Sequence, residues 1–237
     1  MEEITKNSDD LCIAGNHTIG EWKNLKRILK PNIDENWDVA FDFFERRINT
    51  RYINPIEAIQ LMGLNEGEGF AIVNLQCSLI ETIESFYQGW VYEYDKDNKK
   101  LNGYHFREVK GKTLTRVTGG NLINQDIFIS FFNKREPFLG KIDGTDFYQS
   151  VRCGLLHETQ TKNGWKILDK HSDAETFFKE DGNYKIIYRT NLQFAIQKVI
   201  DKYKKAIVGI KAQNEVELRE NFIAKFDRIC ELSKPKS

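Results

Sequence analysis

The segment from 64 to 90, LNEGEGFAIVNLQCSLIETIESFYQGW, constrains the fold more than any other part of this chain. Its apolar side chains recur at helical spacing and cover more than half of a helix's circumference: Phe70, Val73, Leu75, Cys77, Leu79, Ile80, Ile83 and Phe86. A helix that is apolar on most sides must pack against several neighbours. Gly89 is a typical residue for the end of such a helix. We therefore predict a central helix here, with the rest of the fold built around it.

Further helices are predicted on both sides, because apolar residues recur every three or four positions. Their ranges are 36–51, 54–63, 122–135, 147–158, 190–209 and 214–233. Two short apolar runs, WKILDK (165–170) and YKIIYR (184–189), are predicted to pair as a β hairpin. The predicted fold class is therefore mainly α, a helical bundle with a small β hairpin after the helix at 147–158.

The chain is predicted to form one domain with additions. Residues 1–35 are interpreted as an N-terminal appendage, and 36–237 as a helical domain with an insertion at 91–120. The insertion loses helical periodicity, is rich in lysine, asparagine and glycine, and is predicted to contain one irregular hairpin. Two interpretations of its charge are open. Either it is a solvated loop, or its basic residues form a local patch: Lys99, Lys100, Arg107, Lys110, Lys112 and Arg116.

Charge and cysteine usage exclude several classes of protein. Lys and Arg number 35 and Asp and Glu also number 35, so there is no global positive field for duplex binding. The four cysteines lie far apart, which favours neither a zinc site nor a disulfide framework, and we predict no metal and no cofactor. No apolar run reaches the roughly 18 to 20 residues of a membrane span. We expect no membrane association and a cytoplasmic location.

The segment from Phe147 to Trp165, FYQSVRCGLLHETQTKNGW, carries the residues best suited to chemistry. It contains a permanent cation, Arg152, and a side chain that titrates near neutrality, His157. A five-residue offset on a regular helix is about 140° of rotation, so the two side chains do not share one face. They converge if His157 lies in a distorted last turn, or if two copies of the helix meet. Gly154, between them, permits a close backbone approach and favours contact between two helices across a two-fold axis.

Two carboxylates, Glu81 and Glu84, lie three residues apart on the central helix. In the structural interpretation Glu84 is solvated, and Glu81 is partly buried and paired with Arg46, Arg47 or Arg51, because a buried carboxylate normally needs a partner. In the alternative interpretation, Glu81 orients a catalytic group.

The run from Arg152 to His157, RCGLLH, resembles the Arg-x4-6-His signature of the HEPN superfamily, and RCGLLHETQTKNGW looks like the motif block of a bacterial HEPN subgroup. The resemblance covers roughly 36–203 without the insertion. It implies a HEPN-like helical bundle that acts as a homodimeric, metal-independent ribonuclease in antiviral defence, abortive infection or toxin–antitoxin systems. RNA is then the substrate, and an antitoxin or other regulatory protein is an implied partner. Many active members have Asn, Asp or His directly after the arginine, whereas this chain has Cys153.

The family's chemistry assigns roles to these residues. His157 suits proton transfer from the 2′-hydroxyl, and Arg152 suits stabilisation of the charge that grows on the phosphate. Substrate positioning is assigned to Lys162 and Asn163, although such a polar loop is also typical of a simple turn. Supporting roles are assigned to Cys153, Glu81 and Glu158. Two other functions remain open: a non-catalytic module of the same fold that binds RNA, a nucleotide or a partner protein, and a purely structural dimerisation domain.

Overall fold

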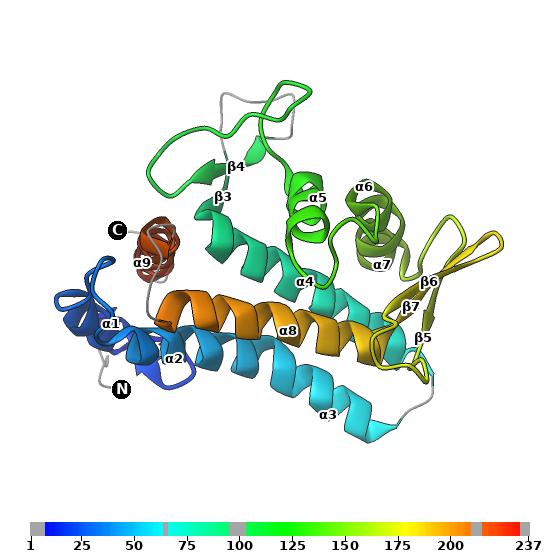
Figure 1. The fold of residues 1–237 in the computed structure, drawn as a ribbon, viewed down its shortest axis with the longest axis horizontal. Helices are drawn as coiled ribbons and strands as arrows, with labels where there is room; N and C mark the ends of the chain where they lie inside the picture. The colour runs from blue at the N-terminus through cyan, green and yellow to red at the C-terminus, as the bar shows by residue number, and fades with distance from the viewer. Residues whose placement is uncertain (1–7, 64–65, 95–102, 210–214, 233–237) are drawn as a thin grey trace, which may run out of the picture.

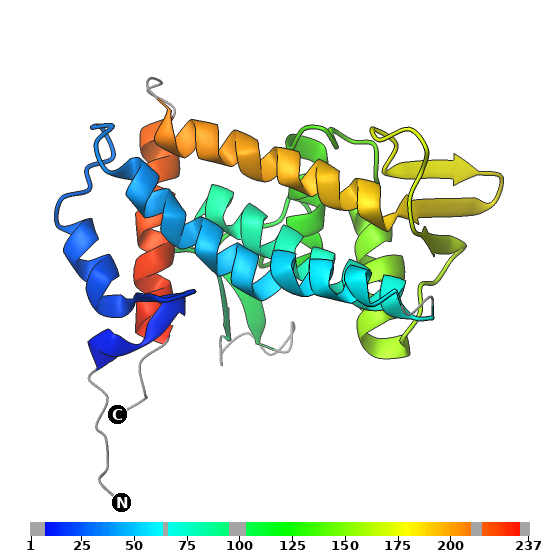
Figure 2. The ribbon, with the colours of Figure 1, turned by 90° about the horizontal axis from the view of Figure 1, so that it is seen from below.

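Three long helical rods run along the length of the molecule (Figure 1). The computed structural model describes residues 8–63, 66–94, 103–209 and 215–232. Two of the rods are single helices, α4 (Glu68–Gln88) and α8 (Arg189–Val208). The third joins α2 (Trp37–Ile48), a π-helical segment (Asn49–Ile53) and α3 (Asn54–Met62). Figure 2 shows α9 (Glu215–Leu232) crossing the rods near one end.

The predicted central helix is confirmed. α4 contacts α3, α5, α8 and α9, and its apolar side chains, including Val73, Ile80 and Ile83, belong to the main core. Gly89 ends the helix in a left-handed conformation at φ 64°. A Cβ at this glycine would also lie 2.6 Å from Oδ1 of Asn221 on α9, so this position needs glycine for two reasons. Phe70 is the exception to the predicted apolar face, because it is 41% exposed.

Shorter helices cover the central helix on the side away from α2. α5 (Asn124–Lys134) packs on α4, next to a rod made of α6 (Gly144–Phe147), a π-helical turn (Tyr148–Arg152) and α7 (Cys153–Glu158). We call this rod, Gly144–Glu158, the motif rod. The predicted separation between the helices 36–51 and 54–63 is absent, because the π-helical segment continues the winding from α2 into α3.

The predicted hairpin of 165–170 with 184–189 is wrong in its pairing. β5 (Trp165–Leu168) and β7 (Tyr184–Tyr188) are parallel neighbours, and the hairpin partner of β7 is β6 (Phe178–Asp181). β6 is an edge strand whose last three residues are exposed. It therefore lacks the alternation of apolar and polar residues that identifies a strand in sequence. In the insertion, β3 (Trp90–Tyr94) and β4 (Tyr104–Glu108) form the predicted hairpin.

The N-terminal segment shares the core of the helical domain. It contains the short strands β1 (Cys12–Ala14) and β2 (His17–Thr18) and the helix α1 (Ile19–Lys26). Ile13, Ile19 and Trp22 are buried in the same core cluster as α2 and α4. Residue 35 therefore does not separate two hydrophobic cores. None of the described helices is long and apolar enough to span a membrane.

Candidate functional site

The motif rod changes its winding just before Arg152. The carboxylate of Asp143 caps its first turn by accepting hydrogen bonds from the backbone N–H groups of Thr145 and Asp146 at 2.8 and 3.1 Å. The π-helical turn Tyr148–Arg152 follows, and π turns are frequent at functional sites. Regular α-helix resumes at Cys153. Because α7 winds regularly, the side chains of Arg152 and His157 leave the rod in different directions.

Arg152 is bound by Glu81 of the central helix. Its Nε donates to Glu81 Oε1 at 3.1 Å, and its guanidinium carbon lies 5.7 Å from the ring centre of Tyr148. Burial raises the pKa of Glu81, although the charge of Arg152 opposes this effect. Burial lowers the pKa of Arg152, but the Glu81 carboxylate, followed by Tyr148 and Cys153, raises it, and the net shift is upward. Burial, and then the neighbouring thiol of Cys153, raise the pKa of Tyr148 to about 12.

The structural interpretation of the two α4 carboxylates is wrong. Glu84 is completely buried rather than solvated. It accepts hydrogen bonds from Arg135 Nε at 2.8 Å, Arg135 Nη2 at 3.1 Å and Ser130 Oγ at 2.6 Å. Glu81 pairs with Arg152 and not with an arginine of the helix 36–51. The alternative interpretation, in which Glu81 orients a catalytic group, stays a prediction.

Gly154 allows the loop after the motif rod to pack closely against the rod within one chain. A Cβ at this position would lie 2.5 Å from the carbonyl oxygen of Gln160, in the loop that follows the rod. This contact gives a reason for the glycine within one chain, and the predicted contact between two helices stays a prediction. His157 is exposed, and it has no hydrogen bond or ion pair with any residue that the structure describes. Within one chain, Arg152 and His157 do not form a joint site.

The loop after the rod is tied back to it through Ser150. The Ser150 hydroxyl donates to Asp146 Oδ1 at 2.7 Å and accepts from Asn163 Nδ2 at 2.9 Å, and the Ser150 carbonyl accepts from the backbone N–H of Lys162 at 2.9 Å. The Asn163 side chain is thus engaged in holding its own loop. The ammonium group of Lys162 is 3.8 Å from Glu158, and both side chains are open to solvent.

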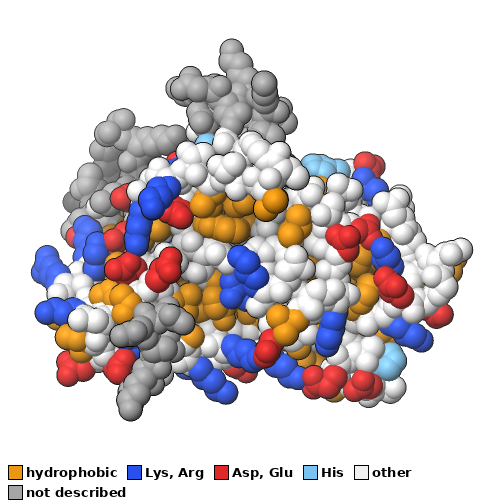
Figure 3. All heavy atoms as spheres, turned by 45° about the horizontal axis from the view of Figure 1, so that its top comes forward, with side chains coloured by type: hydrophobic (Ala, Val, Ile, Leu, Met, Phe, Trp, Pro, Cys, Tyr) orange, Lys and Arg blue, Asp and Glu red, His pale blue; other side chains and the backbone are white. Residues whose placement is uncertain are grey.

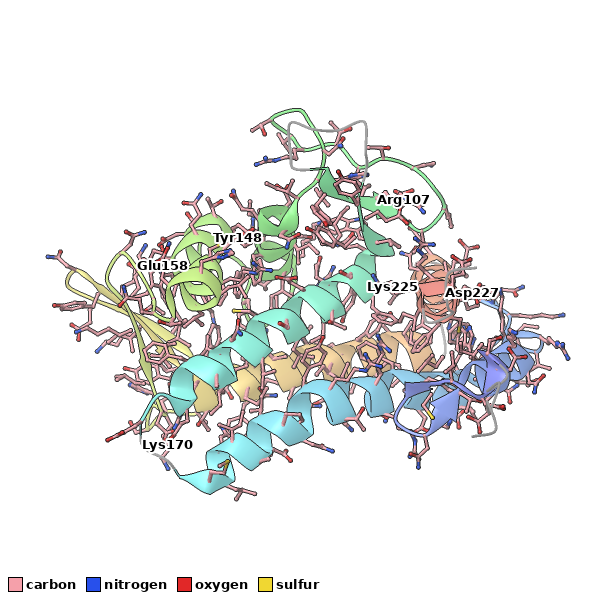
Figure 4. All side chains as sticks on the ribbon, turned by 180° about the vertical axis from the view of Figure 1, so that it is seen from behind. Arg107, Tyr148, Glu158, Lys170, Lys225 and Asp227 are labelled. Atoms are coloured by element: carbon pink, nitrogen blue, oxygen red, sulfur yellow. The ribbon has the colours of Figure 1, made fainter. Side chains whose placement is uncertain are left out.

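A cavity of about 510 Å³ lies beside Arg152. Glu81 and Arg152 line it, whereas His157, Lys162 and Asn163 do not. Its other charged lining residues come from two other helices: Arg47 from α2, and Lys225 and Arg228 from α9. Figure 4 shows where Tyr148 and Glu158 of the motif rod lie relative to Lys225 of α9. The cavity therefore holds four cations and one carboxylate.

The basic residues of the insertion are mostly neutralised where the structure describes them. Three of them are in ion pairs: Arg107 with Glu93, Lys110 with Glu220 and Arg116 with Asp126. Lys99 and Lys100 lie outside the described residues. On the face in Figure 3, Lys and Arg side chains are interspersed with Asp and Glu rather than forming a continuous basic surface. The cavity, and not the insertion, concentrates positive charge.

No protein-family model, curated protein or solved structure matches this chain at a significant level. The described residues also contain no group of three or more His, Cys, Asp or Glu side chains that could hold a metal ion.

Sequence reasoning missed the cations of α9. The apolar stripe predicted for this helix is Val216, Leu218, Phe222, Phe226 and Ile229; the last three are buried and the first two are partly buried. Lys225 and Arg228 each lie one residue before a member of that stripe, so they border the buried face. A cation at such a border is a detectable signal, but the same pattern is also produced by a long side chain whose charged end reaches solvent.

Proposed function

We propose that this protein is a metal-independent endoribonuclease that acts in the cytoplasm as a homodimer, in a bacterial defence or toxin–antitoxin system. The observation that carries the proposal is the placement of Arg152. It lies at the end of a π-helical turn, is held by a carboxylate of the central helix and borders a cationic cavity. The motif resemblance supplies the chemistry, and the exposed, unbonded His157 is available for it.

In this reaction His157 removes the proton of a 2′-hydroxyl group. The 2′ oxygen bonds to the adjacent phosphorus, and the bond from phosphorus to the 5′ oxygen breaks. The guanidinium of Arg152 stabilises the negative charge on the phosphate oxygens, and the departing 5′ oxygen takes a proton from water. The products carry 2′,3′-cyclic phosphate and 5′-hydroxyl ends.

A second copy of the chain can bring the two residues together in one site. Since Arg152 and His157 point in different directions from one rod, the proposal pairs Arg152 of one copy with His157 of the other. Lys162, Cys153 and Glu158 lie close to these residues in sequence and keep the supporting roles of the proposal, and Glu81 orients Arg152.

The test is RNA cleavage in EDTA by the wild-type protein, Arg152→Ala and His157→Ala, with analysis of the product ends. We expect each substitution to reduce the rate by at least about 100-fold, as for loss of a charge-stabilising donor or a general base. Mixing the two inactive variants is expected to restore cleavage, because a mixed dimer contains one intact pair. Cleavage that needs a metal ion, or that survives both substitutions, contradicts the nuclease. Failure of the mixture to recover activity contradicts only the shared site.

The second candidate is a non-catalytic binding module for RNA or a partner protein. It is favoured by the Glu81 carboxylate, which neutralises Arg152 in the described structure. This function predicts RNA binding without cleavage in the wild-type protein, and loss of binding in Arg152→Ala but not in His157→Ala. An electrophoretic mobility assay with both variants distinguishes it from the nuclease.

A further inference from the structure

Two cations in the cavity have no counter-ion among the described residues. Arg47 Nη1 donates to the carbonyl oxygen of Ile13, and Lys225 Nζ donates to that of Trp90. Neither side chain forms an ion pair within the part of the chain that the structure describes. Both side chains are partly buried, and cations withdrawn from water are normally paired, because transfer of an isolated charge out of water is costly.

The two cations are also close enough to repel one another and Arg228. Burial, followed by the charges of Arg47 and Arg228, lowers the pKa of Lys225 to about 8. Burial, followed by the charge of Arg51, lowers the pKa of Arg47 to about 10. The protein therefore maintains an arrangement that is unfavourable when the cavity holds no anion.

Arg228 adds a further unsatisfied donor. Its Nη1 and Nη2 groups donate to Glu231 and Glu93, but its Nε is buried and has no hydrogen-bond partner in the part of the chain that the structure describes. Because those two carboxylates offset the charge of Arg228, and Glu81 offsets that of Arg152, about two positive charges remain uncompensated. A single carboxylate ligand would neutralise only one of them, whereas a phosphate monoester carries about 1.5 to 2 negative charges at pH 7.

We propose that this cavity binds a phosphate monoester, with Lys225 and Arg47 as the residues that hold the phosphate. The cavity volume of about 510 Å³ is larger than a phosphate group needs and is typical of a small-molecule site. The ligand therefore has a body beyond the phosphate, in contact with the apolar wall formed by Val91, Tyr92 and Phe106. A small phosphorylated molecule and the 5′-phosphate end of an RNA strand share this chemistry. The inference goes beyond the proposed nuclease, which assigns no step to Arg47, Lys225 or Arg228.

The test compares Lys225→Met with Lys205→Met. Lys205 is exposed on α8 and does not line the cavity, so its substitution removes the same charge elsewhere. The probes are inorganic phosphate and ribose 5-phosphate, with sodium chloride at equal ionic strength and ribose as controls. Binding is measured by calorimetry and by the thermal shift of the full chain.

We expect both phosphate probes to stabilise the wild-type protein and Lys205→Met, and Lys225→Met to bind them about tenfold or more weakly, as for loss of a charge-assisted contact. Arg47→Gln is expected to give the same loss, which guards against an effect peculiar to one variant. Equal binding by Lys225→Met, or no shift in the wild-type protein, overturns the proposal.

A further arm identifies the source of the phosphate. A short 2′-O-methylated RNA, which this chemistry cannot cleave, is compared with and without a 5′-phosphate. If the 5′-phosphate strengthens binding about tenfold or more and Lys225→Met abolishes the gain, the ligand is an RNA end. If ribose 5-phosphate binds as tightly as the phosphorylated RNA, the ligand is a small molecule. Both outcomes support a phosphate site, and neither depends on cleavage, so failure here is distinguishable from failure of the nuclease.

Discussion

Two cations on the same helix, Arg219 and Lys225 of α9, have opposite surroundings. Arg219 is 3% exposed, and its guanidinium donates to Asp34 Oδ1 at 2.8 Å. It also donates to four backbone carbonyl oxygens, and it lies over the ring of Trp37 at 4.9 Å. Lys225 donates to one carbonyl oxygen and faces two other cations.

The difference separates a charge that holds the fold from one that does not. Arg219 ties the end of α8 and the segment before α2 to α9, since its acceptors come from both. Removing it would take this donor from the carbonyl groups of Ile207 and Pro31, whereas that of Ile33 would keep its hydrogen bond from Trp37 Nε1. Lys225 joins α9 to the start of β3 through a single contact, which an apolar side chain could replace by packing. The chain therefore gains little stability from the charge of Lys225, which is consistent with a binding role.

The largest expected effect is that of Arg219→Met. Asp34 is exposed, but Arg219 is buried and donates to several carbonyl groups; each buried acceptor left without its donor costs about 1 to 3 kcal/mol, and the losses together reach about 3 to 5 kcal/mol. We expect a decrease of that size in the free energy of unfolding, measured by urea denaturation. A decrease below about 1 kcal/mol, the range of an exposed pair, would contradict the structural role of Arg219.

Lys225→Met is expected to increase the free energy of unfolding, whereas Arg219→Met decreases it. The pKa of Lys225 is lowered from 10.5 to about 8, so the unfolded chain binds this proton more tightly than the folded one. Its contribution to stability is therefore unfavourable below pH 8 and is relieved as the pH rises toward 10.5. At pH 7 and without ligand, we expect Lys225→Met to be more stable by about 1 to 3 kcal/mol.

The pH dependence provides the control for this gain. The advantage of Lys225→Met should shrink as the pH is raised from 7 toward 10, measured by thermal unfolding of both proteins. A gain that is independent of pH would mean that packing, and not charge, causes it. A loss of stability at pH 7 would mean that Lys225 stabilises the fold, as Arg219 does.

The smallest expected effect is that of Glu81→Gln. The burial cost of this carboxylate and its attraction to Arg152 oppose one another, so we expect the free energy of unfolding to change by less than about 1 kcal/mol. Because burial raises the pKa of Glu81 above 4.5, the ionised wild-type side chain becomes less favourable as the pH rises through that raised pKa. The stability of Glu81→Gln relative to the wild-type protein should therefore be highest at neutral pH and lowest near pH 4. The reverse trend would show that the pair with Arg152 dominates the stability of this region.

The sequence predicts the helices well and the strands poorly, for a physical reason. Each of four predicted helices buries one face, so apolar residues recur along it at helical spacing. These helices are 36–51, 64–90, 190–209 and 214–233. β6 lies at the edge of its sheet and its pairing with β7 places few apolar side chains in the core. The continuous winding from α2 into α3 was also missed. Pro55 is typical of the first turn of a helix, so the sequence predicted that a separate helix begins there.

The candidate site also has features that the sequence indicated and features that it did not. The sequence indicated that Glu81 is partly buried and needs a partner, but its expected partners were Arg46, Arg47 or Arg51, whereas the structure pairs it with Arg152. The group that leaves no room for a Cβ at Gly154 is the carbonyl oxygen of Gln160, six residues later. Such an approach depends on how the loop turns back after Thr159, which takes a left-handed conformation at φ 58°. Spacing along a helix gives no information about that turn.

By itself, the sequence determined that a mostly apolar helix at the centre would collect amphipathic helices around it, because burial of apolar surface is non-directional and follows residue type. Only the tertiary structure decided which charges were paired. Folding placed Arg135 beside Glu84, Arg152 beside Glu81 and five oxygen acceptors around Arg219. It also placed Lys225 near Arg47 with no counter-ion for either among the described residues. Ion pairs and hydrogen bonds depend on distance and direction between residues far apart in the chain, and these are fixed only when the helices have packed.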